Sequence, residues 1–187
     1  MSTKLLLDII SKGCTMDTVM YNICFNIICH ENKSSDSLSL MMNMIETGFK
    51  PNNVTYNTIL KGLCKEIIEE ALELFDCFEL LPDLITYNIL IRASIREGND
   101  QLLSQLLRDM YIQQGLKPDA VTFGSLIYRL CKEGNITVAR KLWEQMTGNG
   151  ITPNIAIYNT ITEAGNVPYR QVSGHYHVIE GDGNGGL

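Results

Sequence analysis

The chain has 187 residues, which leaves room for one domain or for a short array of repeats. Hydrophobic residues make up 45% and charged residues 19%, a balance that supplies a core and excludes a disordered, solvating chain. The 15 Lys and Arg residues against 21 Asp and Glu residues give a formal net charge of −6, which excludes nucleic-acid binding through bulk positive charge and allows it only along a local basic stripe.

The beginning of the chain carries no visible targeting peptide. Met1–Lys12 has no small-residue cleavage site and lacks the arginines of an organellar presequence. The longest uncharged apolar runs, such as Val19–Cys29, are too short and too polar to cross a bilayer. The sequence therefore predicts no association with a membrane.

Landmarks recur along the chain with a period near 35 residues. The dipeptide Tyr-Asn, replaced once by Phe-Gly, begins at positions 21, 56, 87, 123 and 158, so the successive spacings are 35, 31, 36 and 35 residues. A Gly-x-x-Pro run followed by Asn or Asp occupies 48–52, 115–119 and 150–154, and a shorter Leu-Pro-Asp run occupies 81–83. Landmarks that share one register indicate a repeat protein.

In chain order, these landmarks divide the chain into seven segments. They are a partial repeat (its second helix) at 1–17, repeats at 18–52, 53–83, 84–119 and 120–154, the start of a repeat at 155–162, and an irregular Gly-rich tail at 163–187. The 53–83 repeat has lost four residues, one between its helices and three near its end, and the 84–119 repeat has gained one.

Each repeat is predicted to form two helices. In the 53–83 repeat, apolar residues at helical spacing predict a first helix over Val54–Lys65, and Ile68 to Phe75 mark a second amphipathic helix. Pro82 cannot continue that helix. A lone helix pair cannot bury its apolar stripes, so neighbouring pairs must stack. The predicted fold class is all-α, an α-solenoid of stacked helix-turn-helix repeats.

Polar residues four positions apart share one face of the first helices. They are Asn57, Lys61 and Lys65; Asn88, Arg92 and Arg96; and, in weaker form, Asn22, Asn26 and His30, and Gly124, Tyr128 and Lys132. An amide can meet a base edge while Lys and Arg meet phosphates, which suits a single strand of nucleic acid. The structural alternative is that such an Asn only caps a helix and such basic residues only form a solvated face.

The sequence resembles the pentatricopeptide repeat family, as a P-type member of plant organelles and as a fragment of a longer protein. The resemblance covers residues 1 to about 162 and is carried by Val-Thr-Tyr-Asn-Thr-Ile-Leu-Lys-Gly-Leu-Cys-Lys at 54–65 and Glu-Glu-Ala-Leu-Glu-Leu-Phe at 69–75. The competing family is the tetratricopeptide repeat, whose units bind proteins. The Tyr-Asn-Thr opening and the Pro-Asp or Pro-Asn close of each unit favour the pentatricopeptide family.

This resemblance implies a code in which two residues of each repeat select one base. The base-selecting residues are Asn22 with Asn52 for a pyrimidine (leaning to cytosine), Asn57 with Asp83 and Asn88 with Asp119 for uracil, Gly124 with Asn154 for adenine, and Asn159, which has no partner. The resemblance also implies that Val19, Val54, Ile85 and Val121 wedge bases between repeats. Read from the N-terminus, the expected core is pyrimidine-U-U-A. Lys61, Lys65, Arg92, Arg96 and Lys132 are the candidates for contacts with the RNA backbone.

Other candidate sites are weaker. Cys29, Cys64 and Cys131 share one repeat position on the apolar face, so we expect buried thiols rather than metal ligands. His175 and His177 have the spacing of a metal-binding pair but no third ligand near them. Because no motif for catalysis appears, the sequence predicts no enzyme, no metal and no cofactor.

The function expected from sequence is sequence-specific binding of single-stranded RNA in organellar RNA processing, stability, splicing or translation. By family resemblance the location is the mitochondrion or the chloroplast. The alternatives are a helical scaffold that binds other proteins and a truncated product without independent activity. Because neither end of the predicted array has a polar capping element, self-association through the ends is also expected.

Overall fold

The computed structural model describes residues 17–31, 34–77 and 81–165, and every regular element within these ranges is helical. The chain divides into two compact units, Met1–Pro118 and Asp119–Leu187. The all-α fold class and the stacking of helix pairs are confirmed. Of the partial repeat expected at 1–17, the structure describes Asp17 alone. His175 and His177 also lie outside the described residues.

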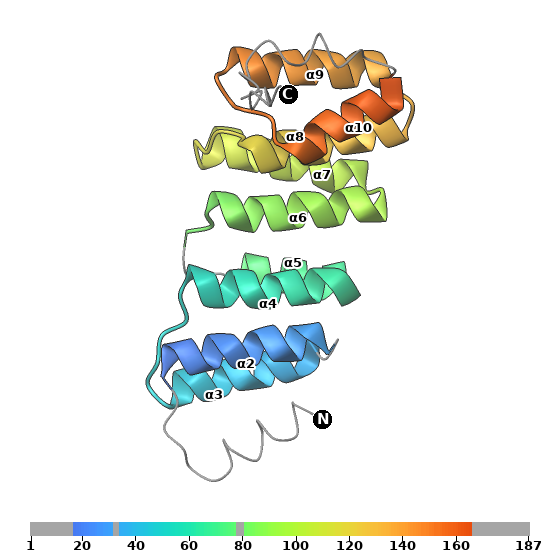
Figure 1. The fold of residues 1–187 in the computed structure, drawn as a ribbon. Helices are drawn as coiled ribbons and strands as arrows, with labels where there is room; N and C mark the ends of the chain where they lie inside the picture. Colours follow the sequence, from blue (N-terminus) through green and yellow to red (C-terminus); the bar gives the residue numbers. More distant parts are fainter. Residues whose placement is uncertain (1–16, 32–33, 78–80, 166–187) are drawn as a thin grey trace, which may run out of the picture. The chain divides into compact units, whose positions relative to one another are not determined.

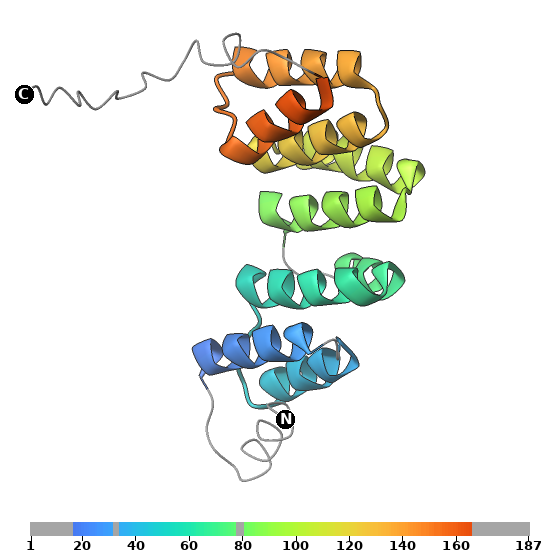
Figure 2. The ribbon, with the colours of Figure 1, turned by 45° about the vertical axis from the view of Figure 1, so that its right-hand side comes forward.

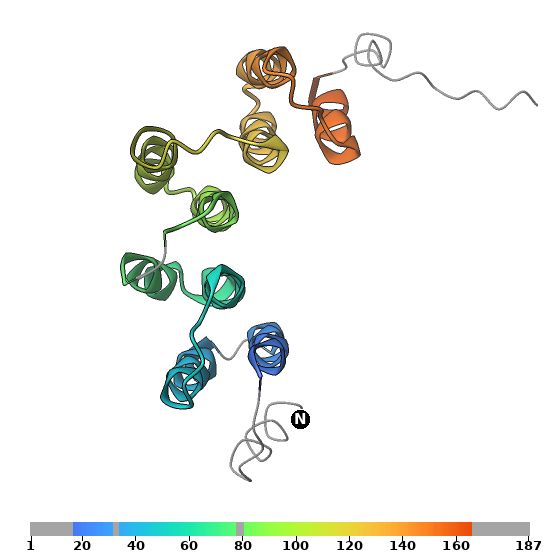
Figure 3. The same ribbon diagram turned by 90° about the vertical axis from the view of Figure 1, so that its left-hand side faces the viewer.

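Three helix pairs make up the described part of the first unit (Figure 1). They are α2 (Thr18–His30) with α3 (Ser34–Glu46), α4 (Asn53–Glu66) with α5 (Ile68–Asp76), and α6 (Leu84–Glu97) with α7 (Asp100–Arg108), which continues into the π-helical turn η1 (Asp109–Gln113). The first helix of each pair packs on the next, α2 on α4 and α4 on α6. Viewed along the helices, α2, α4 and α6 form one layer and α3, α5 and α7 form the other (Figure 3).

The first helices begin at polar caps. Asp17, Asn52 and Asp83 have extended backbone and accept a hydrogen bond from a main-chain N–H in the first turn of α2, α4 and α6. In α4 and α6 the third helical residue is Thr55 or Thr86, whose hydroxyl accepts a hydrogen bond from the N–H of the cap, at 3.5 Å and 3.2 Å respectively. The Pro-Asn and Pro-Asp sequences that end one repeat therefore also start the helix of the next.

One close approach sets the spacing of α2 and α4. Gly62 is buried on α4, and a Cβ atom at this position would lie 2.3 Å from the Sγ and 2.6 Å from the Cβ of Cys29 on α2. Cys29 Sγ also lies 3.6 Å from the carbonyl oxygen of Thr58. The two helix backbones meet at a distance that only glycine allows.

The repeats with unusual lengths take up the change outside their first helices. In the shortened repeat, α4 keeps 14 residues while α5 has nine, and Ile67 alone separates the two helices. In the lengthened repeat, Gln114 N–H donates to the carbonyl oxygen of Asp109 at 3.0 Å, a bond that spans five residues. A π-turn accommodates one extra residue in a helix. The gained residue is therefore absorbed at the end of the second helix.

The second unit contains α8 (Ala120–Lys132), α9 (Ile136–Gly148) and α10 (Ile155–Gly165), each packed on the other two (Figure 2). Its core consists of Phe123, Ile127, Ala139, Met146, Ile157 and Ile161. Residues 163–165, expected from the sequence to lie in an irregular tail, belong to α10, because this helix continues through Gly165. Glu163 and Ala164 are good helix formers, and they extend a helix already held by buried Ile161.

The helices of the described ranges are all too short or too polar to span a membrane.

Candidate nucleic-acid interface

The first unit brings Asn57 and Asp83 together. Asn57 Nδ2 on α4 donates to Asp83 Oδ1, the cap of α6, at 3.2 Å. The hydroxyl of Thr86 lies 2.8 Å from Asn57 Oδ1 and 2.9 Å from Asp83 Oδ1, and thus contacts both partners. Asn53 Nδ2 adds a longer bond to Asp83 Oδ2 at 3.4 Å. The loss of four residues from this repeat therefore leaves the expected pair in contact.

Asn22 and Asn52 form a looser version of the same cluster. Thr55 Oγ1 donates to Asn22 Oδ1 at 2.8 Å and lies 3.2 Å from Asn52 Oδ1. No direct hydrogen bond joins the two amides in the part of the chain that the structure describes. The threonine hydroxyl is the link between them.

Hydrogen bonds keep the Asp83 carboxyl ionised at neutral pH. Burial raises its pKa, but the N–H and hydroxyl of Thr86 and the amides of Asn57 and Asn53 lower it further, so the net pKa lies below the ordinary value. The carboxylate can then only accept hydrogen bonds, whereas the Asn52 amide can also donate.

The other candidate residues are Asn88 in the first unit and Asp119, Gly124, Asn154 and Asn159 in the second. Asn88 is buried on α6 in the first unit, and Asp119 caps α8 in the second, where it accepts from Thr122 N–H at 2.9 Å. Gly124 lies on α8, and Asn154 Oδ1 accepts from Ile157 N–H at 3.0 Å. Asn159 is exposed on α10.

Apolar residues expected to wedge bases are exposed at the second position of each first helix. Val19, Val54 and Ile85 are exposed by 65%, 60% and 61%, and Val121 by 43%. Apolar side chains left in solvent on the same turn as a polar pair offer a surface for the flat face of a base.

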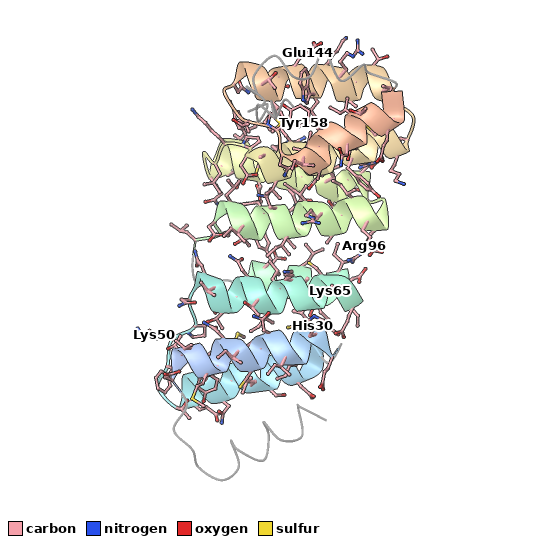
Figure 4. All side chains as sticks on the ribbon, in the orientation of Figure 1. His30, Lys50, Lys65, Arg96, Glu144 and Tyr158 are labelled. Carbon is pink, nitrogen blue, oxygen red and sulfur yellow. The ribbon has the colours of Figure 1, made fainter. Side chains whose placement is uncertain are left out.

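The basic candidates have different environments. Lys61 and Arg92 are exposed on α4 and α6. His30, Lys65 and Arg96 lie at the C-terminal ends of α2, α4 and α6 (Figure 4), where positive charge also complements the helix dipole.

Arg96 and Lys132 have partners within the protein. The Arg96 guanidinium donates to the carbonyl oxygen of Cys64 at the end of α4 and to the Glu97 carboxylate at 3.0 Å. Lys132 Nζ lies 5.6 Å from the ring centroid of Tyr128. Arg96 therefore joins two repeats in addition to any role on the surface.

The threonine hydroxyls were missed by the sequence argument. Thr55, Thr86 and Thr122 precede the aromatic residue of the landmark dipeptide in three repeats, so the pattern is visible in the sequence. The hydrogen bonds of Thr55 and Thr86 to the preceding repeat join residues about 30 positions apart, and the sequence does not show them. Among the described residues, no group of three or more His, Cys, Asp or Glu side chains is placed to hold a metal ion.

These features define a class of protein: a helical-repeat protein in which the N-terminal ends of successive first helices carry linked polar pairs. Three family models match the chain: the PPR repeat family at residues 16–65, the pentatricopeptide repeat domain at 76–111 and the PPR repeat at 114–147. The chain belongs to the pentatricopeptide repeat family.

Curated relatives are proteins of Arabidopsis thaliana. A pentatricopeptide repeat-containing protein is 33% identical over 108 residues, which cover 54% of this chain and 14% of the relative. A chloroplastic pentatricopeptide repeat-containing protein is 26% identical over 164 residues, covering 84% and 21%. The small ribosomal subunit protein mL103 is 25% identical over 157 residues, covering 78% and 36%. The chain thus spans between 14% and 36% of the length of these relatives.

Two solved structures share the fold. The structure of PPR10 in complex with an 18-nt psaJ RNA element matches with a TM-score of 0.52 and 20% identity, covering 92% of this chain and 37% of that one. The PPR domain of Arabidopsis thaliana protein-only RNase P 1, in complex with tRNA, matches with a TM-score of 0.55 and 13% identity, covering 75% and 76%.

Proposed function

We propose that this chain binds single-stranded RNA sequence-specifically, with one base per repeat and without catalysing a reaction. The observation that carries the proposal is the Asn57–Thr86–Asp83 cluster, in which an amide and a carboxylate from adjoining first helices meet. The Asn22–Thr55–Asn52 cluster repeats the arrangement one repeat earlier. Exposed Val54 and Ile85 lie on the first turns of the same helices.

The chemistry of the two clusters favours different pyrimidines. Uracil carries an N–H at the centre of its Watson–Crick edge, and cytosine carries a lone pair there. An ionised Asp83 can only accept, so its cluster favours uracil. An Asn52 amide can turn its N–H₂ group toward a lone pair, so its cluster accepts cytosine. These preferences agree with those that the family resemblance implies.

The whole expected core, pyrimidine-U-U-A, also uses Asn88 with Asp119 and Gly124 with Asn154. Exposed Lys61 and Arg92 are the best candidates for phosphate contacts, because no described residue engages their side chains. Arg96 is a weaker candidate, since Cys64 and Glu97 already use its guanidinium.

We further propose that the RNA is a mitochondrial or chloroplast transcript and that binding serves its processing, stability, splicing or translation. Relatives named as chloroplastic and as mitochondrial support this location. The likeness to two proteins solved with bound RNA supports the choice of ligand.

Selection from a random pool of single-stranded RNA tests the proposal. We expect enrichment of the pyrimidine-U-U-A core with an affinity of about micromolar, because four repeats offer few contacts, each about 1–3 kcal/mol before the cost of ordering the RNA. Affinity should fall as salt rises, and Lys61→Ala should weaken all sequences alike. A pool that emerges without any preferred sequence would contradict the proposal and favour a protein-binding scaffold.

A further inference from the structure

A buried threonine lies between the two members of each polar pair in the first unit. Thr55 and Thr86 are both 0% exposed, and each is the third residue of the helix that follows the pair. Each hydroxyl reaches back to the asparagine of the preceding first helix at 2.8 Å. Each also contacts the cap residue that completes the pair.

The carboxylate and the hydroxyl together determine how the Asn57 amide is oriented. Asp83 can only accept, so the amide of Asn57 must turn its N–H₂ group toward the carboxylate. Its carbonyl oxygen then needs a donor, and the Thr86 hydroxyl supplies one at 2.8 Å. Because the same hydroxyl accepts from the Asp83 N–H at 3.2 Å, its own proton is directed toward the pair. Without this hydroxyl, the carbonyl oxygen of Asn57 would lose its hydrogen-bond donor within the cluster, and the bond to Asp83 alone would hold the amide.

In the second unit, both the threonine and the asparagine of this arrangement are replaced. Ile157 replaces the threonine as third residue of α10, and Gly124 replaces the asparagine on α8. A Cβ atom on Gly124 would lie 3.0 Å from Ile157 Cγ1 and 3.1 Å from Ile157 Cδ1. The Ile157 side chain would have to shift by a few tenths of an ångström to admit a Cβ atom here, and it offers an asparagine no hydrogen-bond donor.

We propose that the third residue of each first helix is a positioning residue that determines which side chain can select a base in the preceding repeat. Thr55 and Thr86 help to hold an asparagine amide in one orientation, and Ile157 disfavours an asparagine at position 124. This inference rests on the proposed RNA binding, and it adds a third residue to each base-selecting pair.

The first test compares Thr86→Val with Thr86→Ser in the full chain, using short RNAs that differ only in uracil or cytosine opposite the Asn57–Asp83 pair. Thr86→Val should reduce the ratio of the two affinities by about 2- to 10-fold, the value of one hydrogen bond. Thr86→Ser should keep the ratio, because it retains the hydroxyl. Thr58→Val is the matched control, since the Thr58 hydroxyl donates to Val54 of its own helix.

A purely structural role would give a different pattern. Thr86 also supports the α6 cap, so Thr86→Val should lower the melting temperature whatever its role. The base ratio separates the two roles: an unchanged ratio with equal weakening of both RNAs overturns the inference while leaving the proposed function intact. Wild-type chain without any base preference would instead overturn the proposed function.

The second test needs no RNA and uses the second unit. Gly124→Asn should lower the melting temperature, because the new side chain meets Ile157 and its amide has no partner there. Ile157→Thr should also lower it, because Ile157 belongs to the core. The melting temperature of the double variant should be higher than the sum of the two separate decreases predicts, because the hydroxyl introduced at position 157 can donate a hydrogen bond to the amide introduced at position 124. Strictly additive losses would overturn the inference.

Discussion

Asp83 and Asn52 occupy the same place in successive repeats but offer a ligand different hydrogen-bonding groups. Both cap a helix through a side-chain oxygen, and both contact a threonine hydroxyl. Only Asp83 carries a charge, and its lowered pKa keeps that charge at neutral pH. The two clusters therefore differ in charge as well as in the direct hydrogen bond that joins Asn57 to Asp83.

The first prediction uses this difference. Asp83→Asn should shift the preferred base at one position from uracil toward cytosine, because the amide can donate where the carboxylate could not. Asn is as good a helix cap as Asp, so stability should change by less than about 1 kcal/mol. Affinities for RNAs that differ at this base check the result, with the reciprocal change Asn52→Asp as control. A uniform loss of affinity for every RNA would contradict the assignment.

The second prediction concerns the cysteines. Burial raises the pKa of the Cys64 thiol to about 12, despite the opposing effect of Arg96, and burial also raises the pKa of the Cys24 and Cys29 thiols. Cys77 is exposed. Because the thiolate is the reactive form, iodoacetamide at mildly alkaline pH should label Cys77 quickly and spare the buried thiols until the chain unfolds. Peptide mapping assigns the label, and rapid native labelling of Cys64 would show that α4 opens locally.

At the scale of the helices, the first helix has the same length in the shortened and in the lengthened repeat. The 31-residue repeat shortens its turn and α5, and the 36-residue repeat adds a π-turn after α7. Since α4 and α6 both keep 14 residues and a capping box, the polar pairs remain in register. The differences in repeat length thus affect the second helices and the segments next to them, and not the first helices that carry the polar pairs.

The third prediction concerns the contact between α2 and α4. Gly62→Ala should destabilise the first unit by about 1–3 kcal/mol, because the new methyl group would overlap Cys29 and its Cβ cannot be moved by a change of rotamer. Gly148→Ala in α9 is the matched control, since no atom lies within 4 Å of a Cβ there. Urea unfolding followed by circular dichroism measures both. Equal stability of the Gly62 variant and the wild type would mean that α2 and α4 can move apart without cost.

At the scale of the whole molecule, the stability of a repeat array is nearly a sum of repeat and nearest-neighbour terms. The chain has one tryptophan, Trp143 on α9, which packs against the core of the second unit. Its fluorescence therefore reports unfolding of that unit, while circular dichroism reports all helices.

The fourth prediction is a broad thermal transition in which the two probes disagree. Gly62→Ala should lower the midpoint seen by circular dichroism and leave the Trp143 midpoint unchanged, because the substituted contact lies in the other unit. Melting curves at several protein concentrations separate self-association from the unfolding of single chains. If circular dichroism and Trp143 fluorescence gave one sharp transition at the same temperature, and Gly62→Ala lowered both midpoints, the two units would not unfold independently.

The sequence by itself determined the repeat, its period and the all-α class, because these follow from local signals: apolar spacing, caps such as Asp83, and prolines that end helices. It also identified Asn57 and Asp83 as a candidate pair through family resemblance. Only the tertiary structure decided that Thr86 links this pair, that Arg96 reaches the end of α4, and that Gly62 meets Cys29. Each of these contacts joins residues about 30 positions apart, and the local sequence carries no record of which side chains stacking will bring within bonding distance.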